Sequence, residues 1–227
     1  MPTCPAPDLP LFTPNARILF QGDSITDGNR GRTEDPNHIL GHGYAFILAA
    51  KYGHQFPERR LTFLNRGVSG NTVAALQARW PEDTLALKPD LLSILIGVND
   101  ASGMLHQLPD RVDLPAFERI YDQLLRETTA ALPGVRLVLG EPFILPVGPV
   151  GERWAEWQAE LKPRQAVAAR LAARHHAVHV PYQQAFDAAC QRAPAEYWIW
   201  DGVHPTYAGH QLMADAWTAA VAAARPR

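Results

Sequence analysis

The stretch Arg17-Ile-Leu-Phe-Gln-Gly-Asp-Ser-Ile-Thr-Asp27 decides how the rest of the chain is interpreted. Residues 18–20 form a short apolar segment typical of a buried β-strand, and a Gly-Asp-Ser turn follows directly. Four more apolar segments of this kind occur downstream, at residues 61–64, 91–96, 135–139 and 177–180. Helix-like segments separate or follow them, at residues 44–52, 72–87, 114–131, 153–175 and 207–224.

This alternation of strands and helices predicts right-handed βαβ units and a parallel sheet covered on both faces. We therefore expect an α/β fold, a three-layer α/β/α sandwich around a central, mostly five-stranded parallel sheet. At 227 residues the chain suits one such domain. We assign residues 17–227 to this domain and residues 1–16 to an N-terminal tail.

The composition excludes several classes of function. The hydrophobic content of 47% is ample for a core, and the net charge of −2 indicates neither a nucleic-acid nor an anionic-membrane partner. The first twenty residues are broken by prolines and lack a secretory pattern, and no apolar run is long enough for a membrane helix. We expect a cytoplasmic protein. Cys4, in a loose tail, and Cys190 are expected to be free thiols.

Polar, glycine-bearing loops follow the first three predicted strands. Ser24 follows the first, residues 67–71 follow the second, and residues 97–100 follow the third. Ligands of open parallel sheets bind at the carboxyl ends of the strands, so these loops are expected to converge at one edge. The loop from Asp201 to His204 precedes the last helix and would close over them.

The residue types at this edge are those of a nucleophilic site. A serine hydroxyl is a poor nucleophile unless a base takes its proton, and the base works best when a third group fixes its tautomer. Ser24 supplies the hydroxyl, and Asp201 and His204 supply a carboxylate and an imidazole three residues apart. The sequence therefore has the outline of a serine hydrolase.

Four blocks, in order, resemble those of the GDSL or SGNH hydrolases. They are Gly22-Asp-Ser-Ile25, Asn65-Arg-Gly-Val-Ser-Gly-Asn-Thr72, Gly97-Val-Asn-Asp100 and Asp201-Gly-Val-His-Pro205. The resemblance implies the flavodoxin-like fold of that family. The longer strings GDSITD, NRGVSGNT, LLSILIGVND and WDGVHPTYAGH are most similar to intracellular bacterial acetylxylan esterases. These enzymes remove acetyl groups from xylo-oligosaccharides.

The resemblance implies a role for each matching residue. Ser24 would attack the ester carbonyl, His204 would act as the base, and Asp201 would hold the imidazole. The backbone N–H groups of Ser24 and Gly70 and the side-chain amide of Asn99 would stabilise the oxyanion. Neither a metal nor an organic cofactor is implied.

Contacts to the substrate are less closely specified. Asp23, Asp27, Arg30 and Trp200 are candidates for substrate binding. Asp27 and Arg30 are assigned to the site entrance, and Trp200 is chosen because it adjoins Asp201. An indole ring suits the face of a sugar, but it suits a core or a subunit interface equally well. Two long segments, residues 27–43 and 141–151, either rim the pocket or only connect elements at the surface.

Three functions remain open on the sequence. The leading hypothesis is a serine esterase that removes acetyl groups from carbohydrate esters, with a small-molecule or oligosaccharide ester as its partner. The second is a lysophospholipase or thioesterase with a longer acyl pocket. The third is a carbohydrate-binding protein without catalysis. The aromatic-rich C-terminal region also indicates a homo-oligomer.

Several other residues are given structural roles. Arg79-Trp80-Pro81 is assigned to the scaffold. His210 is predicted to lie on a helix surface rather than to share a metal with Asp201. His175, His176 and His179 are interpreted as solvated side chains at a junction between a helix and a strand.

Overall fold

The computed structural model describes Leu9 and residues 12–33 and 35–224. Five parallel strands form its sheet: β1 (Arg17–Gly22), β2 (Thr62–Asn65), β3 (Leu91–Leu95), β4 (Arg136–Gly140) and β5 (Val178–Val180). Their order across the sheet is β2-β1-β3-β4-β5, and every neighbouring pair is parallel. The prediction of a five-stranded parallel sheet is confirmed.

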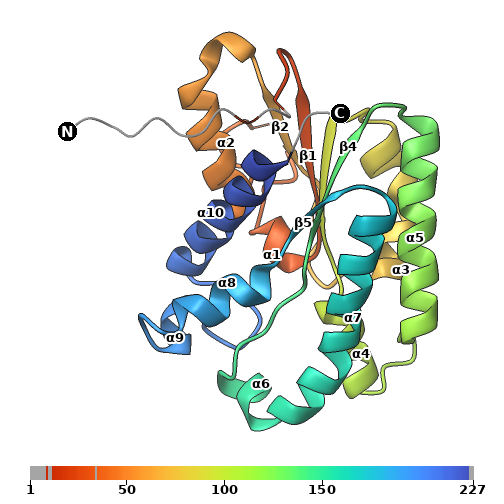
Figure 1. The fold of residues 1–227 in the computed structure, drawn as a ribbon, viewed down its shortest axis with the longest axis vertical. Helices are drawn as coiled ribbons and strands as arrows, with labels where there is room; N and C mark the ends of the chain where they lie inside the picture. The colour runs from red at the N-terminus through yellow and green to blue at the C-terminus, as the bar shows by residue number, and fades with distance from the viewer. Residues whose placement is uncertain (1–8, 10–11, 34, 225–227) are drawn as a thin grey trace.

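Helices cover both faces of the sheet (Figure 1). One face carries α2 (Tyr44–Gln55), α8 (Tyr182–Ala189) and α10 (Tyr207–Ala223), and the other carries α3 (Val73–Ala78), α5 (Leu114–Ala131) and α7 (Trp154–Arg174). The shorter elements are α1 (Ser24–Asp27), the 3₁₀ turn η1 (Pro57–Arg59), the π turn η2 (Pro81–Leu85), α4 (Val98–Leu105), α6 (Gly148–Glu152) and α9 (Ala195–Trp198). The fold is a three-layer α/β/α sandwich.

Alternation along the strands divides the core into two clusters. In β1, Ile18 and Phe20 pack in the cluster under α2 and α10, whereas Leu19 packs in the cluster under α3 and α5. In β3, Leu92 and Ile94 belong to the second cluster. Successive side chains of a strand point to opposite faces, so a strand covered on both sides is apolar throughout. This is why the strands are readable as continuous apolar runs.

The tail assignment is wrong for the residues that the structure describes. Leu9 and Phe12 are buried in the core. The Phe12 ring lies 5.1 Å from Tyr52 and 6.1 Å from Trp217, and the Arg59 side chain donates a hydrogen bond to the Phe12 carbonyl. Residues 9 and 12–16 therefore belong to the domain, whereas Cys4 lies outside the described residues.

Helix boundaries are confirmed closely for α5, α7 and α10, but residues 72–87 do not form one helix. The α-helix ends at Ala78, and Pro81 begins the π turn. Proline lacks the N–H group that would continue the ladder, so the segment is reorganised there. The helices α4 and α8, which begin within three residues of the ends of β3 and β5, are absent from the prediction.

None of the helices among the described residues is both long enough and apolar enough to span a membrane.

Candidate active site

The nucleophile turn lies where β1 ends at the carboxyl edge of the sheet. Ser24 is the first residue of α1, and the side chain of Asp23 caps this helix by accepting a hydrogen bond from the N–H of Ile25 at 3.0 Å. The Ser24 hydroxyl lies 2.9 Å from Nε2 of His204, 180 residues away in the chain. The structure therefore joins the two blocks that the sequence placed at opposite ends.

The loop carrying the carboxylate and the imidazole is a tight, hairpin-like turn. The backbone N–H of Trp200 donates to the carbonyl of His204, and that of Thr206 donates to the carbonyl of Trp198. Inside the turn, Oδ1 of Asp201 accepts the N–H groups of Val203 and His204 at 2.9 and 2.7 Å. Its other oxygen, Oδ2, lies 2.7 Å from Nδ1 of His204.

These contacts determine the tautomer of His204. A carboxylate can only accept, so Nδ1 of His204 carries the hydrogen, and Nε2 is left as the acceptor for the Ser24 hydroxyl. Burial raises the pKa of the Asp201 carboxyl, but hydrogen bonds from the backbone and ring of His204 outweigh it and leave this pKa below its usual value. The site therefore holds a carboxylate, an imidazole and a hydroxyl that are joined by hydrogen bonds.

A second group of donors surrounds the serine. The turn from Val68 to Asn71 places Gly70 at φ +80°, which favours glycine, and leaves this residue exposed. No hydrogen bond within the described residues uses the backbone N–H of Ser24 or of Gly70. Asn99, in the first turn of α4, donates one amide hydrogen to the carbonyl of Asn71 at 3.1 Å. All three donors predicted for the oxyanion thus come from segments that follow β1, β2 and β3 at the same edge of the sheet.

Asp27 fastens the Gly70 turn to the helix that carries Ser24. Its Oδ2 accepts both the backbone N–H and the hydroxyl of Ser69, at 3.0 and 3.1 Å, and its Oδ1 accepts the N–H of Arg30. The guanidinium of Arg32 pairs with both oxygens of this carboxylate, at 3.1 and 2.7 Å. Although burial raises the pKa of Asp27, the Arg32 and Ser69 contacts outweigh it and lower the pKa below its usual value. Asp27 is therefore an ionised anchor of the loop.

Asn65, at the end of β2, joins its own loop to the segments around Thr26 and Leu40. Its amide donates to the carbonyls of Thr26 and Leu40 at 2.7 and 2.9 Å, and its oxygen accepts the N–H of Gly67. At Gly67 the backbone lies against that of Asp27, and a Cβ would collide with it. Asn65 and Gly67 belong to the Asn65–Thr72 sequence block, but the sequence alone assigned them no role.

Arg79 and Asp100 hold the two ends of the segment that joins the Gly70 turn to α3. Arg79 donates to Oδ1 of Asn71 and to the carbonyls of Arg66 and Gly22, tying the turn to the end of β1. Asp100 is buried and accepts the first N–H of α3, that of Val73, at 3.1 Å. Burial raises the pKa of Asp100 to about 6. The scaffold role predicted for Arg79 is confirmed, but its position beneath the site could not be read from the sequence.

The four residues predicted to contact the substrate differ in accessibility. Trp200 is 66% exposed, and its ring is stacked 6.2 Å from that of His204. Arg30 is half-buried and donates from Nε to the carbonyl of Gly67. Asp23 and Asp27 are only 1% and 2% exposed. The assignment of Asp27 to the entrance and of Asp23 to substrate binding is therefore corrected: both carboxyl groups lie below the surface, where each accepts backbone N–H groups.

The apolar segment 141–151 lies beneath the Asp201–His204 turn. Phe143, Ile144 and Leu145 are buried, and the N–H of Leu145 donates to the carbonyl of Gly202 at 3.0 Å. Val150 leaves no room for a Cβ at Gly202. Of the two interpretations of this segment, the structure supports neither a rim nor a bare surface connection, but a support for the turn.

Two further histidine assignments are wrong. His210 is 7% exposed, and its Nδ1 accepts the N–H of Tyr44, the first residue of α2, at 3.3 Å. His175 is not freely solvated, because its Nε2 lies 2.7 Å from the Asp122 carboxylate of α5. Among the described residues, no three His, Cys, Asp or Glu side chains are grouped as a metal site.

A parallel α/β/α sandwich with an Asp–His–Ser chain at the carboxyl ends of its strands defines a serine hydrolase. The chain belongs to the GDSL-like lipase/acylhydrolase family, whose sequence profile matches residues 20–212. It is a serine carboxylic-ester hydrolase.

Two relatives illustrate the likeness. The chain is 34% identical over 206 residues to an acetylxylan esterase of Geobacillus stearothermophilus, covering 88% of this chain and 91% of that enzyme. The crystal structure of Axe2, an acetylxylan esterase from that organism, has a TM-score of 0.83 at 31% identity and covers 92% and 95% of the two chains.

LAE5, an alpha/beta hydrolase enzyme from the metagenome of Lake Arreo, has a TM-score of 0.84 at 34% identity and covers 93% and 97%. The similar structures also include catalytic mutants of Axe2, in which a serine or an aspartate is replaced by alanine.

Proposed function

We propose that this enzyme removes acetyl groups from carbohydrate esters such as acetylated xylo-oligosaccharides, through an acyl-enzyme on Ser24. The observation that carries the proposal is the hydrogen-bonded chain from Asp201 through His204 to Ser24, with separations of 2.7 and 2.9 Å. The acetylxylan esterases among the relatives support the choice of substrate.

The chain of hydrogen bonds gives each residue one task. The Ser24 Oγ attacks the acetyl carbonyl carbon while Nε2 of His204 takes its proton. The imidazolium then returns this proton to the sugar oxygen as the ester bond breaks, leaving acetyl-Ser24 and a free hydroxyl. Water attacks the acetyl-enzyme in the same way and releases acetate. Throughout, the Asp201 carboxylate stabilises the positive charge on His204.

The negative charge that forms on the carbonyl oxygen needs donors fixed in advance. The N–H groups of Ser24 and Gly70 make no other hydrogen bond within the described residues. One hydrogen of the Asn99 amide is held by Asn71, which orients the other. Donors held in this way need not reorganise during the reaction, which is why they stabilise the transition state strongly.

Burial of the apolar segment favours a short acyl group over the lysophospholipase or thioesterase alternative. The large apolar side chains of residues 143–145 pack in the core beneath the acid–base turn. They offer no exposed surface to a long acyl chain. This segment therefore supplies no wall for a long acyl pocket.

Trp200 supplies an apolar face for the sugar. Its ring is exposed and stacked on His204, the residue that must reach the leaving sugar oxygen. Flat apolar area with one polar edge is what the face of a pyranose packs against. We therefore place the sugar ring that carries the acetyl group against Trp200.

The decisive experiment measures acetate release from acetylated xylo-oligosaccharides, with 4-nitrophenyl acetate and a long-chain 4-nitrophenyl ester beside it. We expect rapid acetate release that falls by about 10⁴-fold or more in Ser24→Ala. Hydrolysis of the long-chain ester alone would assign the enzyme to lipids. Sugar binding that is unchanged in Ser24→Ala, without hydrolysis by the wild type, would indicate a binding protein.

The sugar contact has its own test. Trp200→Ala is expected to raise KM for acetylated xylo-oligosaccharides several-fold, because it removes the apolar face, while kcat/KM for 4-nitrophenyl acetate changes little. Leu108→Ala, at another exposed apolar side chain, serves as the control. Equal losses on both substrates would show that Trp200 supports His204 rather than the sugar, and a change in subunit number would assign the ring to self-association.

A further inference from the structure

Asp23, the residue before the nucleophile, has one oxygen without a partner. Its Oδ1 accepts the N–H of Ile25, but Oδ2 is buried and makes no hydrogen bond within the described residues. The residue is 1% exposed, so solvent does not reach the second oxygen. The hydrolytic chain from Asp201 to Ser24 does not use Asp23.

An unpartnered, buried oxygen is informative about charge. A buried carboxylate whose second oxygen meets no donor is costly, because nothing replaces the water that stabilised its charge. A neutral carboxylic acid keeps one acceptor oxygen for the cap and leaves only an uncharged hydroxyl unsatisfied, at a much smaller cost. The geometry at Asp23 therefore favours the neutral acid.

The neighbouring charges are of both signs. His204 favours the ionised form of Asp23, whereas Asp100, itself buried, opposes it. The hydroxyl of Tyr44 is also affected by the charge of Asp23. Beyond Asp100 lies Arg164, whose charge acts on Asp100. Burial is the largest influence on Asp23 and raises its pKa to about 7.

We propose that Asp23 is a positioning residue that works as a neutral carboxylic acid: it caps the helix that carries Ser24 without placing a second negative charge beside the oxyanion and His204. This inference rests on the proposed esterase mechanism. An ionised Asp23 would oppose the negative charge that builds on the carbonyl oxygen.

The test compares Asp23→Asn with Asp23→Ala. Asparagine reproduces the neutral acid and its acceptor oxygen, so kcat/KM for 4-nitrophenyl acetate should stay within about threefold of the wild type. Alanine removes the cap and should lower kcat by about tenfold or more, since Ser24 loses its support. Rescue by asparagine separates this role from one that needs a carboxylate.

The pH profile gives a second readout. If Asp23 is neutral throughout the acidic limb of kcat/KM, this limb is unmoved in Asp23→Asn. If Asp23 is ionised there, removing its charge shifts that limb to lower pH, because the imidazolium loses a stabilising neighbour. Such a shift, or a loss of about 100-fold in a folded Asp23→Asn protein, would overturn the proposal.

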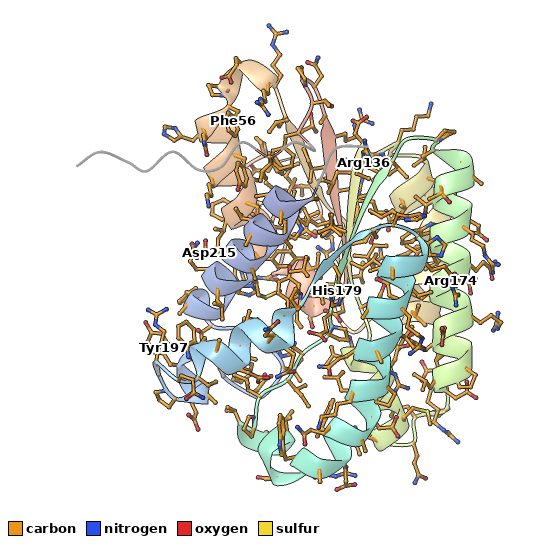
Figure 2. The ribbon with its side chains drawn as sticks, viewed as in Figure 1. Phe56, Arg136, Arg174, His179, Tyr197 and Asp215 are labelled. Atoms are coloured by element: carbon orange, nitrogen blue, oxygen red, sulfur yellow. The ribbon has the colours of Figure 1, made fainter. Side chains whose placement is uncertain are left out.

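Two controls make the result interpretable. Asp215→Asn applies the same change to a side chain on α10 that Figure 2 shows at the outer surface, and it should leave both readouts unchanged. Ser24→Ala shows whether hydrolysis uses Ser24 at all, so failure of the esterase mechanism is distinguished from failure of this inference.

A third readout observes the carboxyl group directly. Carbon-13 NMR of carboxyl-labelled aspartates, at the pH of the kinetic assay, should show in the wild type a protonated carboxyl signal that is missing from Asp23→Asn. If the signal assigned to Asp23 is that of a carboxylate at this pH, the proposal is wrong.

Discussion

Hydrogen-bond donors at the site are oriented by residues that take no part in the reaction. The Asn99 amide is the clearest case, because one of its two hydrogens is engaged by the carbonyl of Asn71. That bond directs the remaining hydrogen, and the rest of the residue lies in the first turn of α4. Replacing Asn99 therefore removes a donor without removing any part of the core.

We expect Asn99→Ala to lower kcat by about 10²–10³-fold, as the loss of one oxyanion donor does elsewhere, with KM changing less. Steady-state kinetics on 4-nitrophenyl acetate and on acetylated xylo-oligosaccharides measure it. Asn37→Ala, the same change in the exposed loop before α2, is the matched control and should be neutral. Unchanged turnover in Asn99→Ala would remove this residue from the oxyanion site.

Asp27 is a second single residue on which the site depends, although it does not contact the reacting atoms. It holds the neighbouring Ser69. Replacement of Asp27 by alanine frees the Ser69 N–H and hydroxyl and leaves Arg32 without its carboxylate. We expect kcat to fall by about tenfold or more, because Gly70 is no longer held against α1. Arg32→Ala, which leaves the Ser69 contacts in place, should lower kcat less. An equal loss in the two variants would show that the ion pair, rather than the Ser69 contacts, holds the turn.

At the scale of elements, the site depends on how loops are fastened to strand ends. The N–H of Val68 donates to the carbonyl of Gly22, and Arg79 donates to the same carbonyl from the end of α3. The break in the helical segment at residues 79–81 allows this, because a continuous helix would carry Arg79 along a regular face. The interruption of the helix therefore contributes to the site, because it lets Arg79 reach the end of β1.

Arg79→Met should destabilise the enzyme and slow it. Arg79 also donates to Oε1 of Gln21, so the change leaves three buried or half-buried acceptors unpaired, on Asn71, Gln21 and Arg66. The carbonyl of Gly22 keeps the N–H of Val68. We expect a loss of about 3 kcal/mol in the free energy of unfolding, and a lower kcat. Urea unfolding and kinetics measure both. Arg170→Met, which removes an exposed pair with Glu118, should cost less than about 1 kcal/mol. Equal losses would contradict the assigned role.

At the scale of the whole molecule, the two helices on one face are joined by His210. Its imidazole, on α10, replaces a side-chain cap at the start of α2, since Gly43 offers none. To accept the Tyr44 N–H the ring must be neutral. Burial lowers the pKa of His210 from 6.5 to about 4.

The stability of the enzyme should therefore fall in mild acid. Above pH 6.5 His210 is neutral in both states; between pH 6.5 and 4 the unfolded chain takes up a proton that the folded protein resists. This lowering of the His210 pKa corresponds to a loss of roughly 3 kcal/mol in the free energy of unfolding.

We expect the free energy of unfolding to fall less over this range in His210→Asn than in the wild type, as measured by urea unfolding at several pH values. The raised pKa values of Asp23 and Asp100 act in the opposite direction, so only the difference between the two proteins is diagnostic. Identical slopes would mean that His210 does not titrate differently on folding.

The layers of this protein and the residues of its candidate catalytic chain can be predicted from the sequence. Strands such as Leu91–Leu95, buried on both faces, must be apolar throughout, and Ser24, Asp201 and His204 stand in short blocks whose spacing is local. Such features depend on neighbours along the chain, so they can be read from it.

The residues that support the site could not be predicted from the sequence, because their roles depend on contacts between distant segments. Asp23 and Asp27 are polar residues beside a nucleophile, and nothing in their sequence neighbourhood shows that each is buried under backbone N–H groups. His210 lies on a helix whose surface pattern does not indicate that the start of α2 covers it. Burial and pKa depend on which distant segments pack together, and that information is absent from any short stretch of sequence.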